Sequence, residues 1–159
     1  MKERCPVCGA ESNLEFKPYN IPYFGDIMLF TVSCPSCGYH SSDVMLLSGD
    51  KSRKRHEIFV SSTEDLNITV VRSSYGRIEI PELGVSVEPR RGESFITTVE
   101  GVLMRVERVV KMLSREEGGG ARKERAERIL RRIEDIKAGK AKMRLIIDDP
   151  TGNSAIIPR

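Results

Sequence analysis

The sequence predicts a mostly β-sheet protein with an α-helical insertion and a four-cysteine zinc ribbon at its N-terminus. Three observations support this fold class. The cysteines form two matched pairs, short β-type segments separated by turn residues follow them, and residues 97–139 switch to a helical period before β-type segments resume. A chain of 159 residues suits one domain with a small metal-held appendage. We therefore expect a zinc-ribbon module at residues 1–48 and a β-domain at residues 49–159.

The metal-binding prediction rests on the only cysteines of the chain, spaced C-x2-C-x25-C-x2-C: Cys5, Cys8, Cys34 and Cys37. Each pair has the sequence Cys-Pro-x-Cys-Gly. Proline fixes the backbone after the first cysteine, and glycine allows a turn with positive φ whose N–H groups point back at the sulfurs. Two such knuckles supply four soft ligands and close a tetrahedral site without an open position. We expect a structural zinc ion with no catalytic role.

Other uses of the cysteines are less consistent with the sequence. Disulfides need an oxidising compartment, and residues 1–4 lack the apolar stretch of a secretory signal. An iron–sulfur cluster and a redox-active pair are the remaining alternatives. A thioredoxin-like redox pair normally occurs as a single CxxC at the start of a helix, not as two matched knuckles.

The β-type segments divide between the two modules. Residues 27–32 lead into the second knuckle, and residues 39–47 return as a partner strand, which is typical of a zinc ribbon built from short hairpins. Further strands are expected at residues 67–73, 77–80 and 85–88, separated by turns. Short strands at this spacing favour an antiparallel sandwich or roll over a βαβ arrangement.

A helical hairpin is expected at about residues 97–139. Thr97 and Glu100 have the spacing of a capping box, and residues 118–120 are three glycines that would separate two helices. Strands expected at residues 142–148 and 155–157 make the hairpin an insertion into the β-domain. The predicted apolar faces consist of Val99, Val102, Leu103, Val106, Val109, Val110 and Leu113 in the first helix, and of Ala126, Ile129, Leu130, Ile133 and Ile136 in the second.

Charge and hydropathy limit the classes of function that fit this sequence. The net charge is +3, and no apolar run approaches the ~18 residues of a membrane span, so we expect a cytoplasmic protein without a membrane partner. The basic run at residues 51–56 is expected to be a solvated loop, with a phosphate or acidic-partner contact as the alternative. No Ser-His-Asp order, open metal site or recognisable carboxylate pair is present, so we do not expect an enzyme.

Several phrases add a family resemblance. They are IPYFGDI at residues 21–27, CGY at 37–39, IPEL at 80–83, TTVEG at 97–101 and DDPTGNS at 148–154. With the cysteine frame, they make nearly the whole chain resemble the ZPR-type zinc-finger proteins, which bind translation elongation factor 1-alpha. The resemblance implies a zinc finger like those of translation initiation factors, followed by a double-stranded β-helix domain carrying a helical hairpin. The chain has one such module, as archaeal members do, whereas eukaryotic members have two.

This resemblance implies that the protein binds elongation factor 1-alpha and assists its folding. A nucleic-acid-binding or transcription-associated zinc ribbon is the alternative. The candidate partner contacts are Tyr23 and Phe24, and Asp149, Asn153 and Ser154 of the terminal phrase. Tyr23 and Phe24 could instead pack the ribbon onto the β-domain, and turn chemistry equally explains the terminal phrase.

Overall fold

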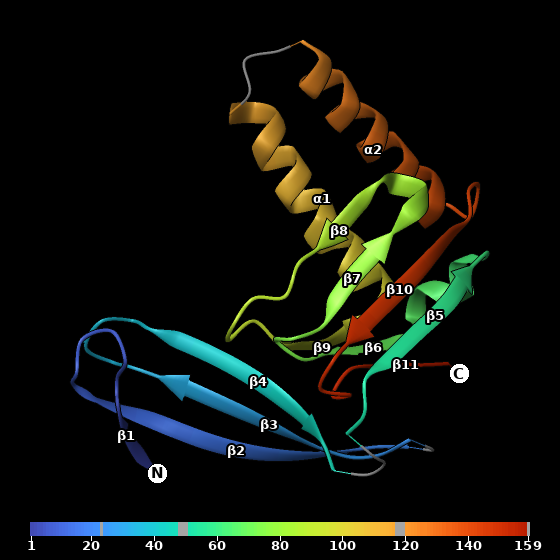
Figure 1. The fold of residues 1–159 in the computed structure, drawn as a ribbon. Helices are drawn as coiled ribbons and strands as arrows, with labels where there is room; N and C mark the ends of the chain where they lie inside the picture. Colours follow the sequence, from blue (N-terminus) through green and yellow to red (C-terminus); the bar gives the residue numbers. More distant parts are fainter. Residues whose placement is uncertain (23, 48–50, 117–119, 159) are drawn as a thin grey trace.

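An elongated arm and a thicker body make up the computed structural model, which describes residues 1–22, 24–47, 51–116 and 120–158 (Figure 1). The arm, residues 1–47, is one antiparallel sheet in the order β1-β2-β3-β4. Its strands are β1 (Lys2–Arg4), β2 (Glu11–Ile21), β3 (Gly25–Ser33) and β4 (His40–Leu46). The predicted module boundary at residues 48 and 49 lies outside the described residues.

The body, residues 51–158, contains two antiparallel sheets, ordered β5-β10-β7-β8 and β11-β6-β9. Within the described residues, two short 3-10 helices and two α-helices complete it. Its elements are β5 (Lys54–Val60), η1 (Thr63–Asn67), β6 (Thr69–Arg72), β7 (Arg77–Ile80), η2 (Pro81–Leu83), β8 (Val85–Val87), β9 (Phe95–Thr98), α1 (Val99–Glu116), α2 (Ala121–Lys137), β10 (Met143–Asp149) and β11 (Ala155–Ile157).

The main core lies between the two body sheets and the lower halves of the helices. Strand β10 lies between β5 and β7 and supplies the fully buried Met143, Leu145 and Ile147, because these alternate residues point to the face of the sheet that packs into the core. Ile133 and Ile136 of α2 join the same apolar cluster. The mostly β architecture with two helices, in which strands precede and follow the helical pair, confirms the predicted fold class.

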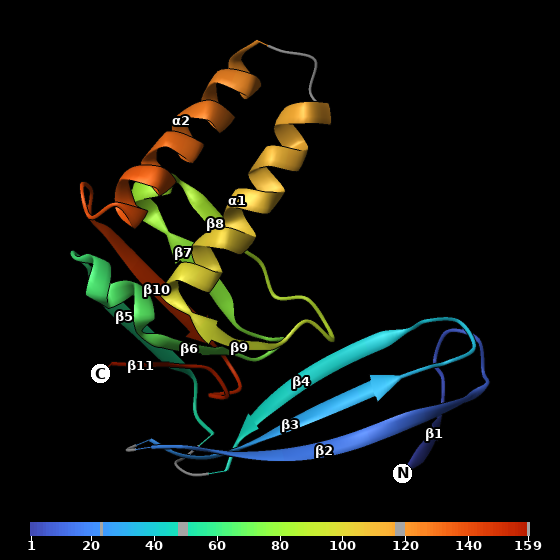
Figure 2. The ribbon, with the colours of Figure 1, turned by 180° about the vertical axis from the view of Figure 1, so that it is seen from behind.

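The helical hairpin rises from the end of the body, as the two opposite views show (Figures 1 and 2). Helix α1 follows β9 directly, and Thr98 Oγ1 accepts a hydrogen bond from the Gly101 amide at 3.1 Å. The cap predicted at Thr97 is therefore wrong by one residue, because β9 continues through Thr98. Val109 and Leu113 are each 49% exposed, since the second half of α1 extends beyond the sheets. Gly118 and Gly119 lie outside the described residues.

The basic run is only partly a loop. Residues 54–56 belong to β5 and pair with β10, with Lys54 opposite Asp149 and His56 opposite Ile147. The expectation of a loop across residues 51–56 is therefore wrong for its second half. The reason is tertiary: β10 has β7 on one side and gains its other hydrogen-bonded neighbour from this segment.

Strand β2 is longer than the short hairpin strands that the sequence suggests. It pairs with β3 from Asn13 to Ile21, whereas β1 covers its other edge only at residues 11–13. The Leu14 amide also donates to the Met1 carbonyl, at 2.8 Å. Because successive amides of a strand alternate between its two edges, the nitrogen of Pro18 faces the same outer edge as that of Leu14. Proline has no N–H there, so this part of the edge cannot donate to another strand.

Candidate metal centre

The four cysteine sulfurs meet at the far end of the arm. Cys5 Sγ lies 3.6 Å from Cys37 Sγ, Cys8 Sγ lies 3.6 Å from Cys34 Sγ, and all four atoms lie within 4.8 Å of one another. A tetrahedral zinc ion with Zn–S bonds of about 2.3 Å requires sulfurs about 3.8 Å apart. The sulfur cluster therefore fits one zinc ion, and each knuckle supplies two of its ligands.

The two knuckles have the same backbone structure. In each, the amide of the first cysteine donates to the carbonyl five residues later, at 2.8 and 2.9 Å, and the glycine amide donates back to the cysteine carbonyl, at 3.0 and 2.9 Å. Gly9 and Gly38 have φ of 76° and 79°, a region that residues with a side chain rarely adopt. Cys5 and Cys34 are buried, whereas the second cysteine of each pair is exposed. The Pro and Gly of each phrase thus preform the ligand geometry.

The electrostatics of the thiols also favour a cation. The Cys8 amide, together with the Val7 amide, outweighs burial and lowers the pKa of Cys5 to about 6. The Tyr39 amide favours the Cys37 thiolate, but burial and the other three sulfurs outweigh it and raise the pKa of Cys37 to about 12. Four thiols this close cannot all ionise by themselves, because the charges would repel. A bound zinc ion removes that penalty, and its binding therefore releases protons.

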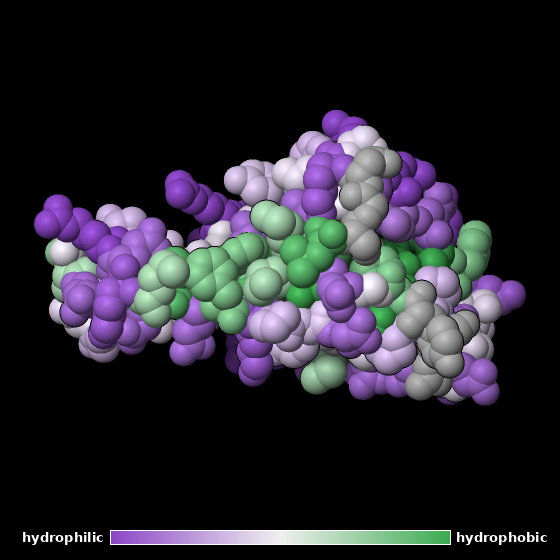
Figure 3. All heavy atoms as spheres, turned by 90° about the horizontal axis from the view of Figure 1, so that it is seen from below, coloured by the Kyte–Doolittle hydropathy of each residue, from purple (hydrophilic) through white to green (hydrophobic). Residues whose placement is uncertain are grey.

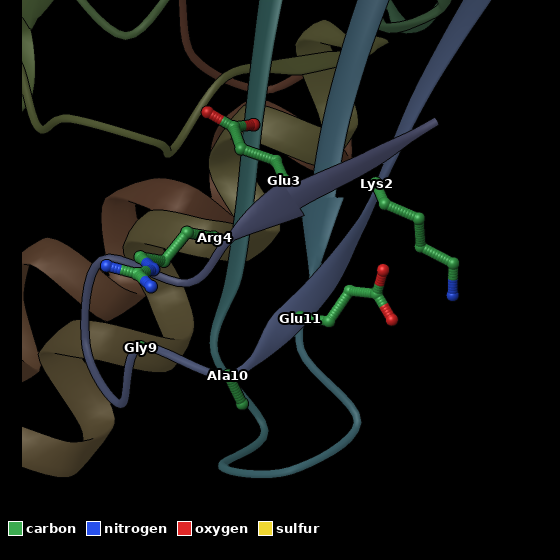
Figure 4. Close-up of a pocket in the computed structure, with 6 residues that line it drawn as sticks. All are labelled: Lys2, Glu3, Arg4, Gly9, Ala10 and Glu11. Carbon is green, nitrogen blue, oxygen red and sulfur yellow. The ribbon is translucent and has the colours of Figure 1, made fainter.

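A shallow hollow lies beside the first knuckle, with a volume of about 370 Å³ (Figure 4). Figure 4 shows that the charged side chains around it point in different directions. A catalytic site needs acidic, basic or nucleophilic groups that converge on one position, and these groups do not. The lining residues are Lys2, Glu3, Arg4, Gly9, Ala10 and Glu11.

The outer edge of β4 joins the arm to the body by backbone hydrogen bonds. The Ser42 amide donates to the Gly92 carbonyl at 2.8 Å, and the Ser94 amide donates to the Ser42 carbonyl at 3.2 Å. Further along, the Leu46 amide donates to Asn153 Oδ1 at 3.2 Å, and Lys51 Nζ donates to the Leu46 carbonyl. The body therefore satisfies both ends of this strand edge.

A charged hydrogen bond and an apolar cluster complete the contact between the arm and the body, which we call the joint. Asp43 Oδ2 accepts from the Ser74 hydroxyl at 2.8 Å, and Asp43 Oδ1 accepts from the Val44 amide at 2.8 Å. Phe24 packs against the cluster and so belongs to this joint, while Tyr23 lies outside the described residues. The buried members of the cluster are Ile27, Val44, Leu46, Val71 and Ala155.

The terminal phrase forms a buried turn. Asp149 and Ser154 have no exposed surface, and Asp149 Oδ2 accepts from the Ser154 and Ser73 hydroxyls, both at 2.5 Å. Burial alone would raise the pKa of Asp149, but these hydroxyls and Thr151 outweigh it and hold that pKa below its ordinary value. Asp149 and Ser154 are therefore buried in a turn from which Asn153 reaches the arm.

One buried cation was not anticipated from the sequence. Arg72 is 2% exposed, and its guanidinium donates to three carbonyls, those of Gly76 at 2.9 Å, Glu93 at 2.8 Å and Glu88 at 2.7 Å. It thereby fixes the strap, residues 88–94, whose Gly92 and Ser94 hold β4. An arginine that ends an otherwise apolar strand segment was the available signal.

The face of the arm that points away from the body carries an apolar band (Figure 3). Phe16 lies opposite Phe30 in the β2–β3 register, with ring centroids 5.2 Å apart and perpendicular planes. Met28 and Met45 lie opposite each other in the β3–β4 register. Phe16, Met45 and Leu47 are 47%, 40% and 51% exposed. This outer face of the arm is an exposed apolar surface that the sequence interpretation missed, although residues 14–18 and 28–32 place its apolar residues at every second position.

No helix among the described residues is both long enough and apolar enough to cross a bilayer.

Comparison with known proteins places both modules. Residues 1–49 match the ZPR1 zinc-finger domain, and residues 64–159 match the ZPR1 jelly-roll domain. Uncharacterized ZPR1-like proteins of Pyrococcus horikoshii and Methanocaldococcus jannaschii are each 40% identical to the chain over 96% of its length, which corresponds to 71% and 78% of their own lengths.

A eukaryotic relative is similar over the same share of the chain. The zinc finger chaperone zpr1 of Schizosaccharomyces pombe is 31% identical over 96% of this chain, which spans 33% of that protein. The zinc-finger match and the sulfur geometry together confirm the prediction of a structural zinc ion. The jelly-roll match agrees with the antiparallel sheets of the body. The chain belongs to the ZPR1 family of zinc-finger proteins.

Proposed function

We propose that this protein binds translation elongation factor 1-alpha and assists its folding. The observation that carries the proposal is the similarity, over 96% of the chain, to a fission yeast protein named a zinc finger chaperone. The family resemblance of the sequence supplies the identity of the partner. The proposal places the protein in the cytoplasm, where translation factors act, and assigns it no enzymatic activity.

The arm and the joint support a chaperone-like role. Ser42, Asp43 and Leu46 all bond to the body, so the arm is held at a fixed orientation. A pre-ordered binder loses less conformational entropy on association than a flexible one. The exposed Phe16 and Met45 offer apolar contacts to a client whose own core residues are not yet buried.

The charges of the basic segment favour a protein partner over nucleic acid. Arg53 pairs with Asp148 at 2.9 Å, and Arg55 pairs with Glu57 at 3.1 Å. A phosphate backbone would have to compete with these carboxylates and would approach their negative charge. The alternative of a nucleic-acid-binding zinc ribbon is therefore the less supported of the two.

The test is a calorimetric titration of the zinc-loaded, nuclease-treated protein against elongation factor 1-alpha, first with GDP and then with a GTP analogue. A parallel assay measures the yield of native factor on refolding from denaturant. We expect saturable one-to-one binding or an increased refolding yield. Phe16→Asp should weaken the binding or the refolding assistance about tenfold or more, whereas Phe59→Asp, at an even more exposed aromatic on the body, should not. Absence of both binding and assisted refolding would refute the proposal.

A further inference from the structure

A groove between β8 and α1 has a volume of about 600 Å³ and carries no role in the description above. Val85 and Val87 of β8 form one wall. Val109 and Leu113 of α1 form the other, and both are about half exposed. The volume falls within the range of roughly 300–1,000 Å³ that is usual for ligand sites. The groove therefore presents solvent-exposed apolar surface of a size that a ligand could cover.

One end of the groove is positively charged. The Arg105 guanidinium lies 4.3 Å from the centroid of the Phe95 ring, which supports it by a cation–π contact. The positions one turn before and after it on α1 are Gly101 and Val109, which cannot neutralise it. Within the described part of the chain, no carboxylate forms an ion pair with Arg105.

The other charged side chains at this end of the groove already have partners. Glu93 pairs with Arg90 at 3.3 Å, and Glu88 pairs with Arg77 at 3.0 Å. The buried Arg72 gives its N–H groups to backbone carbonyls, as described above. Arg105 is thus the cation that a negatively charged ligand would meet, and an arginine held over an aromatic ring can bind a carboxylate through two hydrogen bonds.

The backbone of the groove also suits a polypeptide. Strand β8 is the last strand of its sheet, so one of its edges has no strand partner within the described residues. An extended segment can add to such an edge through main-chain hydrogen bonds and direct every second side chain to one face. A lipid would use the apolar walls but not this edge.

We propose that this groove binds a peptide segment of a partner protein that combines apolar side chains with a carboxylate. The apolar side chains pack against Val109 and Leu113, and the carboxylate, from an acidic residue or a chain end, binds Arg105. This site is separate from the outer face of the arm, and the proposal requires no particular identity of the partner.

The test is a selection of displayed random dodecapeptides on the zinc-loaded protein, followed by fluorescence anisotropy with the enriched peptides after synthesis. Arg105→Met removes the charge but keeps an unbranched side chain, and Leu113→Glu places a negative charge on the apolar wall. Arg108→Met and Met112→Glu are the matched controls, because they make the same changes at exposed positions of α1 that do not line the groove.

We expect enriched peptides that carry acidic and apolar residues. Their dissociation constants should increase about tenfold or more in Arg105→Met and Leu113→Glu and stay within about twofold in the controls. Replacing the acidic residue of the peptide by its amide should reproduce the loss. The proposal is overturned if no enriched peptide distinguishes the wild type from Leu113→Glu, or if Arg108→Met weakens binding as much as Arg105→Met. It is also overturned if a fatty acid binds the groove and the peptides do not compete with it. Since the selection does not involve elongation factor 1-alpha, its failure would leave the proposed function standing.

Discussion

The Ser74 hydroxyl donates to Asp43 Oδ2 at 2.8 Å and so links the body to the middle of the arm's last strand. The two residues are 31 positions apart in the chain, and each comes from a different module. The same carboxylate accepts the Val44 amide and thereby satisfies a strand edge that has no strand partner at this point. One side chain thus stabilises both the edge of the arm and its attachment.

A double-mutant cycle measures this link. Asp43→Ala and Ser74→Ala should show a coupling energy of about 1–3 kcal/mol in urea unfolding, because the hydrogen bond is partly buried and its acceptor is charged. The exposed pair of Ser86 and Glu88, 3.1 Å apart, provides the control and should couple by less than about 0.5 kcal/mol. Equal coupling in the two pairs would mean that the joint contributes no more than a surface contact.

Removal of one zinc ligand should have a local effect. Cys8→Ser should release zinc and unfold the knuckle end of the arm, while the body retains its cooperative unfolding transition, because the main core draws none of the described arm residues into its cluster. Metal analysis after gel filtration and amide hydrogen exchange of β10 measure the two effects. Val7→Ser changes an exposed neighbour, 68% exposed, and should keep the metal. Full zinc content in Cys8→Ser would contradict the four-thiolate site.

Asp149 should make the free energy of unfolding depend on pH in the acidic range. Its pKa is lowered in the folded protein, so the carboxylate contributes stability that is present above the ordinary value of 3.8 and is lost as the pH falls through the lower folded value. Asp149→Asn should therefore be less stable than the wild type by about 1–3 kcal/mol near neutral pH, and the gap should narrow below pH 3.8. Because both proteins lose zinc in acid, the difference between their urea midpoints is the informative quantity. The exposed Glu64→Gln should give no such gap, and a gap for Asp149→Asn that stays constant down to low pH would rule out this account.

Arg72 should be more important for stability than the other arginines of the sheets. Arg72→Met leaves the buried Gly76 carbonyl and the partly buried Glu88 and Glu93 carbonyls without their donor and should reduce the free energy of unfolding by about 3 kcal/mol or more. It should also speed hydrogen exchange at the amides of Ser42 and Ser94, since the strap that holds β4 loses its anchor. Arg77→Met removes only exposed ion pairs and should cost less than about 1 kcal/mol. Similar losses in the two variants would show that the buried guanidinium is dispensable.

The features predicted correctly from the sequence are those that local spacing determines. The zinc site requires only two short phrases, and the helical hairpin shows a period of 3.6 residues. The position of the helix cap and the burial of Val109 and Leu113 depended on where the sheets end, which the period does not show. Strand β2 was not predicted from the sequence, although Leu14 and Phe16 alternate with polar residues, because Pro18 disfavours a strand; pairing with β3 overcomes this preference.

The joint could not be predicted because its partners are far apart in the chain. Asp43 with Ser74, and Leu46 with Asn153, leave no local signature. Asp149 and Ser154 have the composition of a surface turn, and turn chemistry is the same whether a turn faces solvent or is buried. Only the structure shows that the Ser73 hydroxyl, from a distant part of the chain, donates to the buried Asp149 carboxylate.

Pro18 and the bonds of β4 together determine how the arm can associate. On one side, the body occupies the amides of Ser42 and Leu46, and on the other, β1 and Pro18 interrupt the run of free N–H groups along β2. A second copy therefore cannot easily extend this sheet by adding strand to strand, which is the usual first step of fibril growth. The arm thus exposes phenylalanine and methionine on its outer face while its two edges offer a second copy few N–H groups in a row.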